Sequence, residues 1–130
     1  MPSSLPAAVA AFIAAHLRTI DDLHLLVATS SERNRWWDAD AVARELTIDE
    51  AEARRLLEHL AGQNLLDIRL TDDVRYQYKP GTRQLAQEAQ ACVDAYRSNP
   101  AAVWRALVRA RSGASARDFA EAFRIKRDDR

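Results

Sequence analysis

The chain has 130 residues, which suits one domain or a small domain with an appendage, and its nineteen basic side chains balance nineteen acidic ones. Hydrophobic residues make up 48% and charged residues 29%, a balance that supports a packed core and excludes wholesale disorder. No apolar run reaches the roughly 18 residues of a membrane-spanning helix, and the first residues lack the basic stretch of a signal peptide. We therefore expect a cytoplasmic protein without a membrane partner.

Two helices are predicted at the start of the chain. Apolar residues recur at helical spacing and predict a helix over about residues 5–18. A second apolar cluster, residues 23–27, follows Asp21 and Asp22, and acidic side chains favour the positive end of a new helix. The polar stretch 29–35 then predicts a loop.

The next segment has the pattern of a helix-turn-helix. A short helix is expected over Ala39–Leu46, with Asp38 or Asp40 as its N-cap. A longer helix follows at once, and Thr47 with Glu50 has the spacing of a capping box at its start. Two helices separated by only a few residues, the second one longer, are typical of this motif.

A hairpin follows, because the apolar period changes from about 3.6 to 2. Apolar and polar residues alternate over 66–70 and again over 74–78, with Thr71–Asp73 as the turn between them. Tyr76 and Tyr78 share one face of the second strand, and we expect them to pack on the preceding helix. A strand pair directly after a helix-turn-helix is a wing.

The remainder of the chain reads as helical. A helix is predicted from Thr82, a second one restarts at Pro100, and Ser115 is expected to cap a short final helix. Cys92 is the single cysteine and lies on an apolar stripe, so a buried inert thiol is favoured over a redox sensor. One cysteine forms no intramolecular disulfide and no cysteine-based metal cage.

These segments resemble the MarR-like bacterial transcription regulators of the winged-helix superfamily over about residues 20–80. The residues that carry the resemblance are mostly packing positions: Leu25, Leu26, residues 41–48, Arg55, Leu56, Leu57, Leu60 and residues 63–66. Asn64 stands where this family usually has glycine, and asparagine accepts a left-handed backbone better than most residues.

The resemblance implies an α+β fold, a winged helix-turn-helix with a three-helix core, a two-stranded wing and flanking N- and C-terminal helices. Residues 1–81 would form the winged-helix domain, including the N-terminal helix. Residues 82–130 would form a helical extension for dimerisation or partner binding.

The resemblance also places the helix over Asp49–Ala61 in the major groove of DNA, with the wing on an adjacent groove or the backbone. The residues that would bind DNA or another partner are Asp49, Glu50, Glu52, Arg54 and Arg55 of this helix, and Arg69 and Arg75 of the wing. Three carboxylates in the first turn repel phosphates, which are normally neutralised by lysine and arginine. The acids could instead stabilise the helix start or dock a basic partner, and the two arginines could pair with acids of their own helix.

Two functions therefore stay open. One is a transcription regulator that binds double-stranded DNA as a homodimer, and the other is a winged helix whose acidic face docks a basic protein. An enzyme is not expected, because the sequence has no nucleophile motif and its three glycines leave little room for a phosphate-binding loop. His16, His24 and His59 are far apart in sequence, so we expect no metal site. We also expect no cofactor and no small-molecule substrate.

A second candidate surface, for a dimer or a partner, consists of Trp37, Trp104, Arg105 and Arg109. Adjacent tryptophans at 36 and 37 in a very short strand must point to opposite faces, so that one can be buried while the other needs a neighbouring helix, another subunit or a partner. Residues 95–117 hold five arginines and no acid, which gives the C-terminal part a basic character. This segment could also contact nucleic acid, but we favour a dimer or partner surface.

Overall fold

The computed structural model describes residues 5–111 and confirms the α+β winged helix-turn-helix. In chain order its elements are α1 (Ala7–His16), α2 (Ile20–Ser31), α3 (Ala39–Leu46), α4 (Glu50–Gly62), β1 (Leu66–Leu70), β2 (Val74–Tyr78) and α5 (Arg83–Ser98). Residues 100–111 are also helical, as expected from Pro100. The final helix expected from Ser115 lies outside the described residues.

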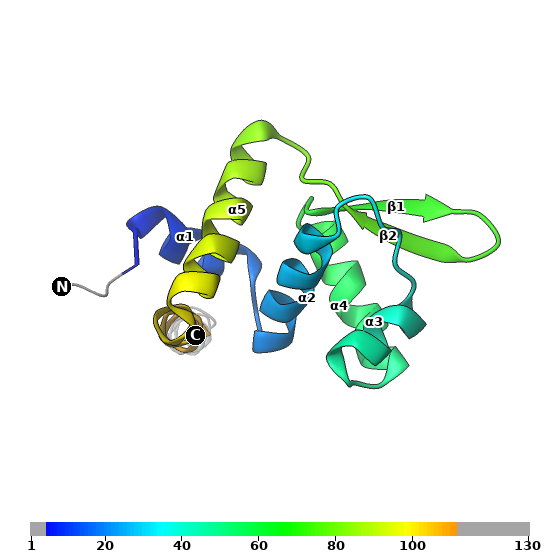
Figure 1. Ribbon diagram of the computed structural model, residues 1–130, viewed down its shortest axis with the longest axis horizontal. Coiled ribbons are helices and arrows are strands. Elements are labelled where there is room, and N and C mark those ends of the chain that lie inside the picture. The colour runs from blue at the N-terminus through cyan, green and yellow to red at the C-terminus, as the bar shows by residue number, and fades with distance from the viewer. Residues whose placement is uncertain (1–4, 112–130) are drawn as a thin grey trace, which may run out of the picture.

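The wing and the helix-turn-helix lie at one end of the molecule, and α1 and α5 lie at the other, with α2 between them (Figure 1). The helix α4 packs against α2, α3 and β1, while α1 packs against α5. A single cluster of buried residues runs from Val9 to Leu107 and joins the two ends. The predicted division of the chain at residue 81 stays a prediction.

The helix α2 is longer than the sequence indicated. Thr29 and Ser30 are buried in it, whereas residues 29–35 were expected to form a loop. The Thr29 hydroxyl donates to the carbonyl oxygen of Leu25 at 2.8 Å. Because this hydroxyl bonds within the preceding turn, a polar residue is accommodated inside the helix, and the loop begins only after Ser31.

The prediction of a capping box formed by Thr47 and Glu50 at the start of α4 is wrong. Thr47 is the C-cap of α3 with φ 58°, and this left-handed conformation is not that of an N-cap. Asp49 is the N-cap, and its side chain accepts from the Glu52 backbone N–H at 2.8 Å. Asp38 caps α3 in the same way, as one of the two predicted alternatives.

The two adjacent tryptophans point to different environments, as predicted. Trp37 forms the expected very short strand, because its N–H donates to the Tyr76 carbonyl at 2.7 Å and Tyr76 returns the bond at 2.8 Å. Its side chain is 0% exposed, which corrects the prediction that Trp37 belongs to a dimer or partner surface. The partly exposed tryptophan is Trp36.

Cys92 lies on the inner face of α5 and is buried, in agreement with the structural interpretation of the sequence. Burial raises the pKa of its thiol from 9.0 to about 12.

We predict that Cys92 is unreactive in the folded protein. The thiolate is the nucleophile, and this pKa change lowers the thiolate fraction about 1,000-fold at neutral pH. Labelling by a chromogenic disulfide reagent should therefore follow global unfolding and be fast only in concentrated denaturant. Equal rates with and without denaturant would show that the thiol is accessible.

Candidate binding interface

The exposed side of α4 carries both predicted arginines, and each is bound by an acid of the same helix. Arg54 Nη2 lies 3.1 Å from Glu50 Oε2, and Arg55 Nε donates to Glu52 Oε1 at 3.1 Å. The hydrogen bond and charge of Glu52 raise the pKa of Arg55. These pairs match the structural interpretation of the sequence.

The charge of this helix is therefore negative where a partner would meet it. Asp49, Glu50, Glu52 and Glu58 face two arginines, so the balance is 2 − 4 = −2. The backbone N–H of Glu52, near the positive end of the helix, is already bound by the Asp49 carboxylate. Little positive potential remains at the start of α4 to attract a phosphate.

A groove of about 280 Å³ lies between α3, α4 and β2. Its lining combines five acids with one arginine and three apolar or aromatic residues: Asp38, Asp40, Glu50, Glu58, Asp73, Arg54, Ala39, Val74 and Tyr76. Tyr76 is buried, as predicted from its face of the strand, and lies against α4 residues of the groove. Burial, and then the charge of Glu58, raise the pKa of Tyr76.

The wing continues this groove with an apolar tip. Ile68, Leu70 and Val74 are 48%, 75% and 44% exposed. They lie on one face of the hairpin, since Ile68 pairs with Tyr76 and Leu70 pairs with Val74. The sequence predicted only that Tyr76 and Tyr78 on this face pack on the preceding helix. The closeness of Leu70 and Val74 to the turn is the signal that the face extends beyond the core.

The opposite face of the wing carries the two predicted arginines. Arg69 and Arg75 pair directly across the strands, an arrangement in which like charges repel. Arg75 Nε donates to Asp73 Oδ1 at 3.1 Å, and this hydrogen bond raises the pKa of Arg75. Arg69 lies over the ring of Trp36, 5.4 Å from its centroid. An anion placed between the two guanidinium groups would relieve their repulsion.

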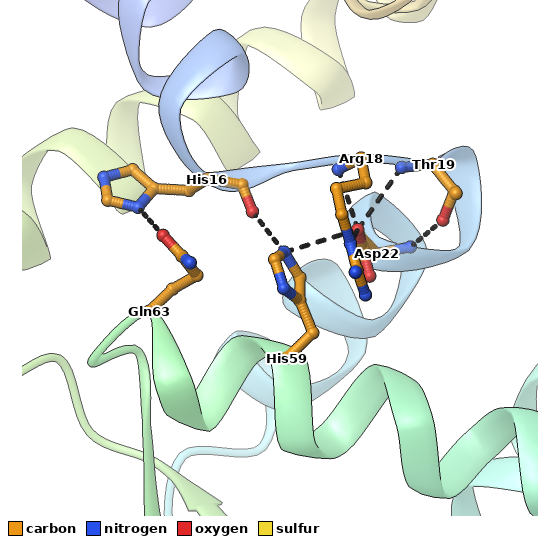
Figure 2. A network of polar contacts seen from close by, with 6 residues as sticks. All are labelled: His16, Arg18, Thr19, Asp22, His59 and Gln63. Atoms are coloured by element: carbon orange, nitrogen blue, oxygen red, sulfur yellow. Dashed lines mark hydrogen bonds and ion pairs between the residues drawn. The ribbon is translucent and has the colours of Figure 1, made fainter. Parts of the chain in front are cut away.

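A polar network holds the end of α4 against the junction of α1 and α2 (Figure 2). His59 Nε2 donates to the carbonyl oxygen of His16 at 2.8 Å, and His16 Nδ1 donates to Gln63 Oε1 at 2.7 Å. The buried Asp22 lies 3.7 Å from His59 Nε2 through its Oδ2. Histidines that are far apart in sequence therefore meet here, in a contact that positions α4.

Asp22 also closes the turn that starts α2. Its Oδ2 accepts from the backbone N–H groups of Arg18 at 2.8 Å and Thr19 at 3.3 Å, and its own N–H donates to Thr19 Oγ1 at 3.2 Å. This reciprocal capping box satisfies backbone donors that would otherwise be unpaired.

The second predicted surface lies on the helix of residues 100–111, at the end of the molecule opposite the wing (Figure 1). Trp104 and Val108 are 48% and 46% exposed, and Arg105 and Arg109 are exposed beside them. Trp37 is buried at a distance from this set, against the wing strand β2. The predicted site residues therefore fall on two separate ends.

Among residues 5–111, no three histidine, cysteine, aspartate or glutamate side chains are grouped so as to hold a metal ion. In the same range, no helix has both the length and the apolar character to cross a membrane.

No model of a protein family matches the sequence, and a search of curated proteins finds no match. One similar solved structure is the adhesin competence repressor AdcR from Streptococcus pyogenes, with 15% sequence identity and a TM-score of 0.47. The similarity covers 85% of this chain and 83% of that chain. The winged-helix assignment follows from the element order and the antiparallel wing, and this likeness adds no argument about function.

We predict that Asp22→Ala destabilises the protein by about 2–4 kcal/mol, because two partly buried backbone N–H groups lose the acceptor that the buried Asp22 side chain provides. Urea denaturation measures the loss. Asp21→Ala removes a carboxylate from the same turn, where no hydrogen bond to it is found, and should cost less than about 1 kcal/mol. Equal losses in the two variants would contradict the role given to Asp22.

Proposed function

We propose that this chain is a non-catalytic winged-helix regulator whose α4 and wing bind a basic segment of a protein partner. The observation that carries the proposal is the charge distribution on the exposed side of α4. Both of its arginines are bound by acids of the same helix, and carboxylates dominate the exposed side.

The charge around α4 supports a cationic partner. Residues 38–79, which hold α3, α4 and the wing, contain six bases and ten acids, so their balance is 6 − 10 = −4. Affinity for duplex DNA rests on neutralisation of phosphates by lysine and arginine. A partner that presents lysine or arginine would be attracted by the same field that repels DNA.

Duplex DNA bound by a homodimer is the second candidate, and the polar face of the wing favours it. Arg69 and Arg75 repel each other across the strands, and a backbone phosphate between them would remove this cost. The partly exposed Trp36 beside Arg69 would shield such a contact from water.

A homodimer is proposed through the opposite end of the molecule. Trp104 and Val108 stand one helical turn apart and expose apolar surface there. The same end of the molecule also holds α1, whose exposed residues are alanines at positions 7, 8, 10, 11, 14 and 15. A second copy would cover this apolar surface and leave both wings free.

We predict that the protein binds a lysine-rich synthetic peptide at low salt and shows no measurable retention on duplex DNA. Fluorescence anisotropy measures the affinity of the protein for the labelled peptide and for the labelled duplex. Retention of any duplex with a log–log salt slope near −0.9 per phosphate contact would establish the DNA candidate in its place.

The variant Glu50→Lys with Glu52→Lys tests the same site from the protein side. Peptide affinity should fall at least about tenfold, because two attractive charges become repulsive. Glu88→Lys with Asp94→Lys makes the same charge change on α5 and is the matched control, for which affinity should change by less than about threefold. If both pairs weaken binding equally, only net charge acts and the proposed face is wrong.

We predict that Trp104→Ser with Val108→Ser converts a dimer into a monomer in sedimentation equilibrium, because the apolar centre of the contact is lost. Leu70→Ser removes a still more exposed aliphatic side chain from the wing and should leave the mass of the dimer unchanged. A wild-type protein that is monomeric at high concentration would contradict the dimer.

A further inference from the structure

We infer that the groove between α4 and the wing receives an amphipathic cationic segment of a partner protein, with aliphatic side chains as well as lysine or arginine. This inference rests on the proposed function and specifies the partner of that site. The aliphatic side chains would pack on the wing tip, Ile68, Leu70 and Val74. The cations would face the carboxylates of the groove.

The wing tip supplies the apolar half of the site. Its three aliphatic side chains are among the five most exposed large hydrophobic residues of the part of the chain that the structure describes. They form one strip that continues from the buried Tyr76 at the base of the wing. A peptide of lysine or arginine alone would leave this strip in water, whereas an aliphatic side chain would cover it.

The groove supplies the charged half. Three of its acids already have a cation, since Asp40 pairs with Arg44, Glu50 with Arg54, and Asp73 with Arg75. Asp38 is occupied by the backbone of α3 as its N-cap.

Glu58 is different, because it makes no ion pair with any residue in the range 5–111. It is exposed, lines the groove beside Tyr76, and lies one turn after Arg54 on the same face of α4. Glu58 is therefore the carboxylate best placed to accept a cation from outside, next to the apolar strip.

Charge complementarity decides which occupant fits. Of the five carboxylates that line the groove, three are paired with arginines, and within residues 5–111 Asp38 and Glu58 are left without a cation, so a positively charged occupant is favoured. The basic helix of residues 100–111 lies at the opposite end of the same molecule (Figure 1), so it does not reach its own groove. A separate cationic protein is the occupant to which we commit, and a second copy of this chain is an outcome of the test.

Two labelled synthetic peptides of equal length and charge test the inference with the full chain. Both carry lysines on one side of a helix, while the other side holds leucines in the first peptide and serines in the second. Fluorescence anisotropy at low salt should give at least about tenfold tighter binding of the leucine peptide. Glu58→Gln should weaken both peptides, because it removes the unpaired carboxylate and keeps the shape of the side chain.

The wing variant Leu70→Thr with Val74→Thr isolates the apolar contribution. Threonine favours strands and both positions are exposed, so the fold should persist, as circular dichroism can verify. This variant should bind the two peptides with similar affinity, near that of the wild type for the serine peptide. Val108→Thr, at a similarly exposed aliphatic residue on the opposite end, is the matched control and should keep the preference.

The outcomes separate this inference from the proposed function. Equal affinity of the wild type for both peptides would overturn the apolar part and leave the acidic face as a cation-binding surface. Failure of both peptides to bind would overturn both proposals. Self-association without peptide, abolished by the wing variant, would assign the groove to a second copy and overturn the inference.

Discussion

The wing is held to the body of the protein by the paired backbone hydrogen bonds of Trp37 and Tyr76, and the candidate site depends on this connection. A two-stranded hairpin alone is only marginally stable in water. Here Trp37 adds a bridge to the outer edge of β2, and its fully buried side chain belongs to the core. The base of the wing is thereby fixed beside α4, while the tip, with Leu70 at 75% exposure, projects beyond the core.

The carboxylates at the start of α4 stabilise the helix and also set the charge that a partner would meet there. Asp49 satisfies a backbone N–H that the helix leaves unpaired, and Glu50 lies near the positive end of the helix, where negative charge is stabilising. Any partner that approaches the N-terminal end of the helix meets the same negative charges. A phosphate backbone is repelled by groups that also stabilise the helix, so removing them to admit DNA would cost helix stability.

Much of the fold could be predicted from local signals. The change of period after α4 predicted the hairpin, and the expected left-handed conformation of Asn64 is found with φ 66°. The choice between Thr47 and Asp49 as the N-cap could not be made locally, because both are good capping residues and only the turn geometry excludes Thr47. The prediction that placed Trp37 on a dimer or partner surface was wrong, since alternation shows that the two tryptophans differ but not which one faces inward.

The candidate site was predicted only in part, for a physical reason. The charged residues of α4 and the wing could be named because a helix-turn-helix exposes them whatever the partner is. The groove depends on Asp40 of α3, Glu58 of α4 and Val74 of β2 meeting in space, and no local pattern encodes that meeting. The alternation of Ile68, Leu70 and Val74 shows which face is apolar, but it does not show that this face is buried at Tyr76 and exposed toward the tip.

The winged-helix fold places a helix and a hairpin side by side and leaves their chemistry open. In this chain the two faces of the hairpin differ in kind. One carries opposed arginines beside Trp36, and the other carries aliphatic residues that lead into an acidic groove. An anionic rod such as DNA would complement only the first face, while α4 packs along the second. Both arginines of α4 are already bound by acids of the same helix, which supports the proposal that the face shared by α4 and the wing tip selects the class of partner.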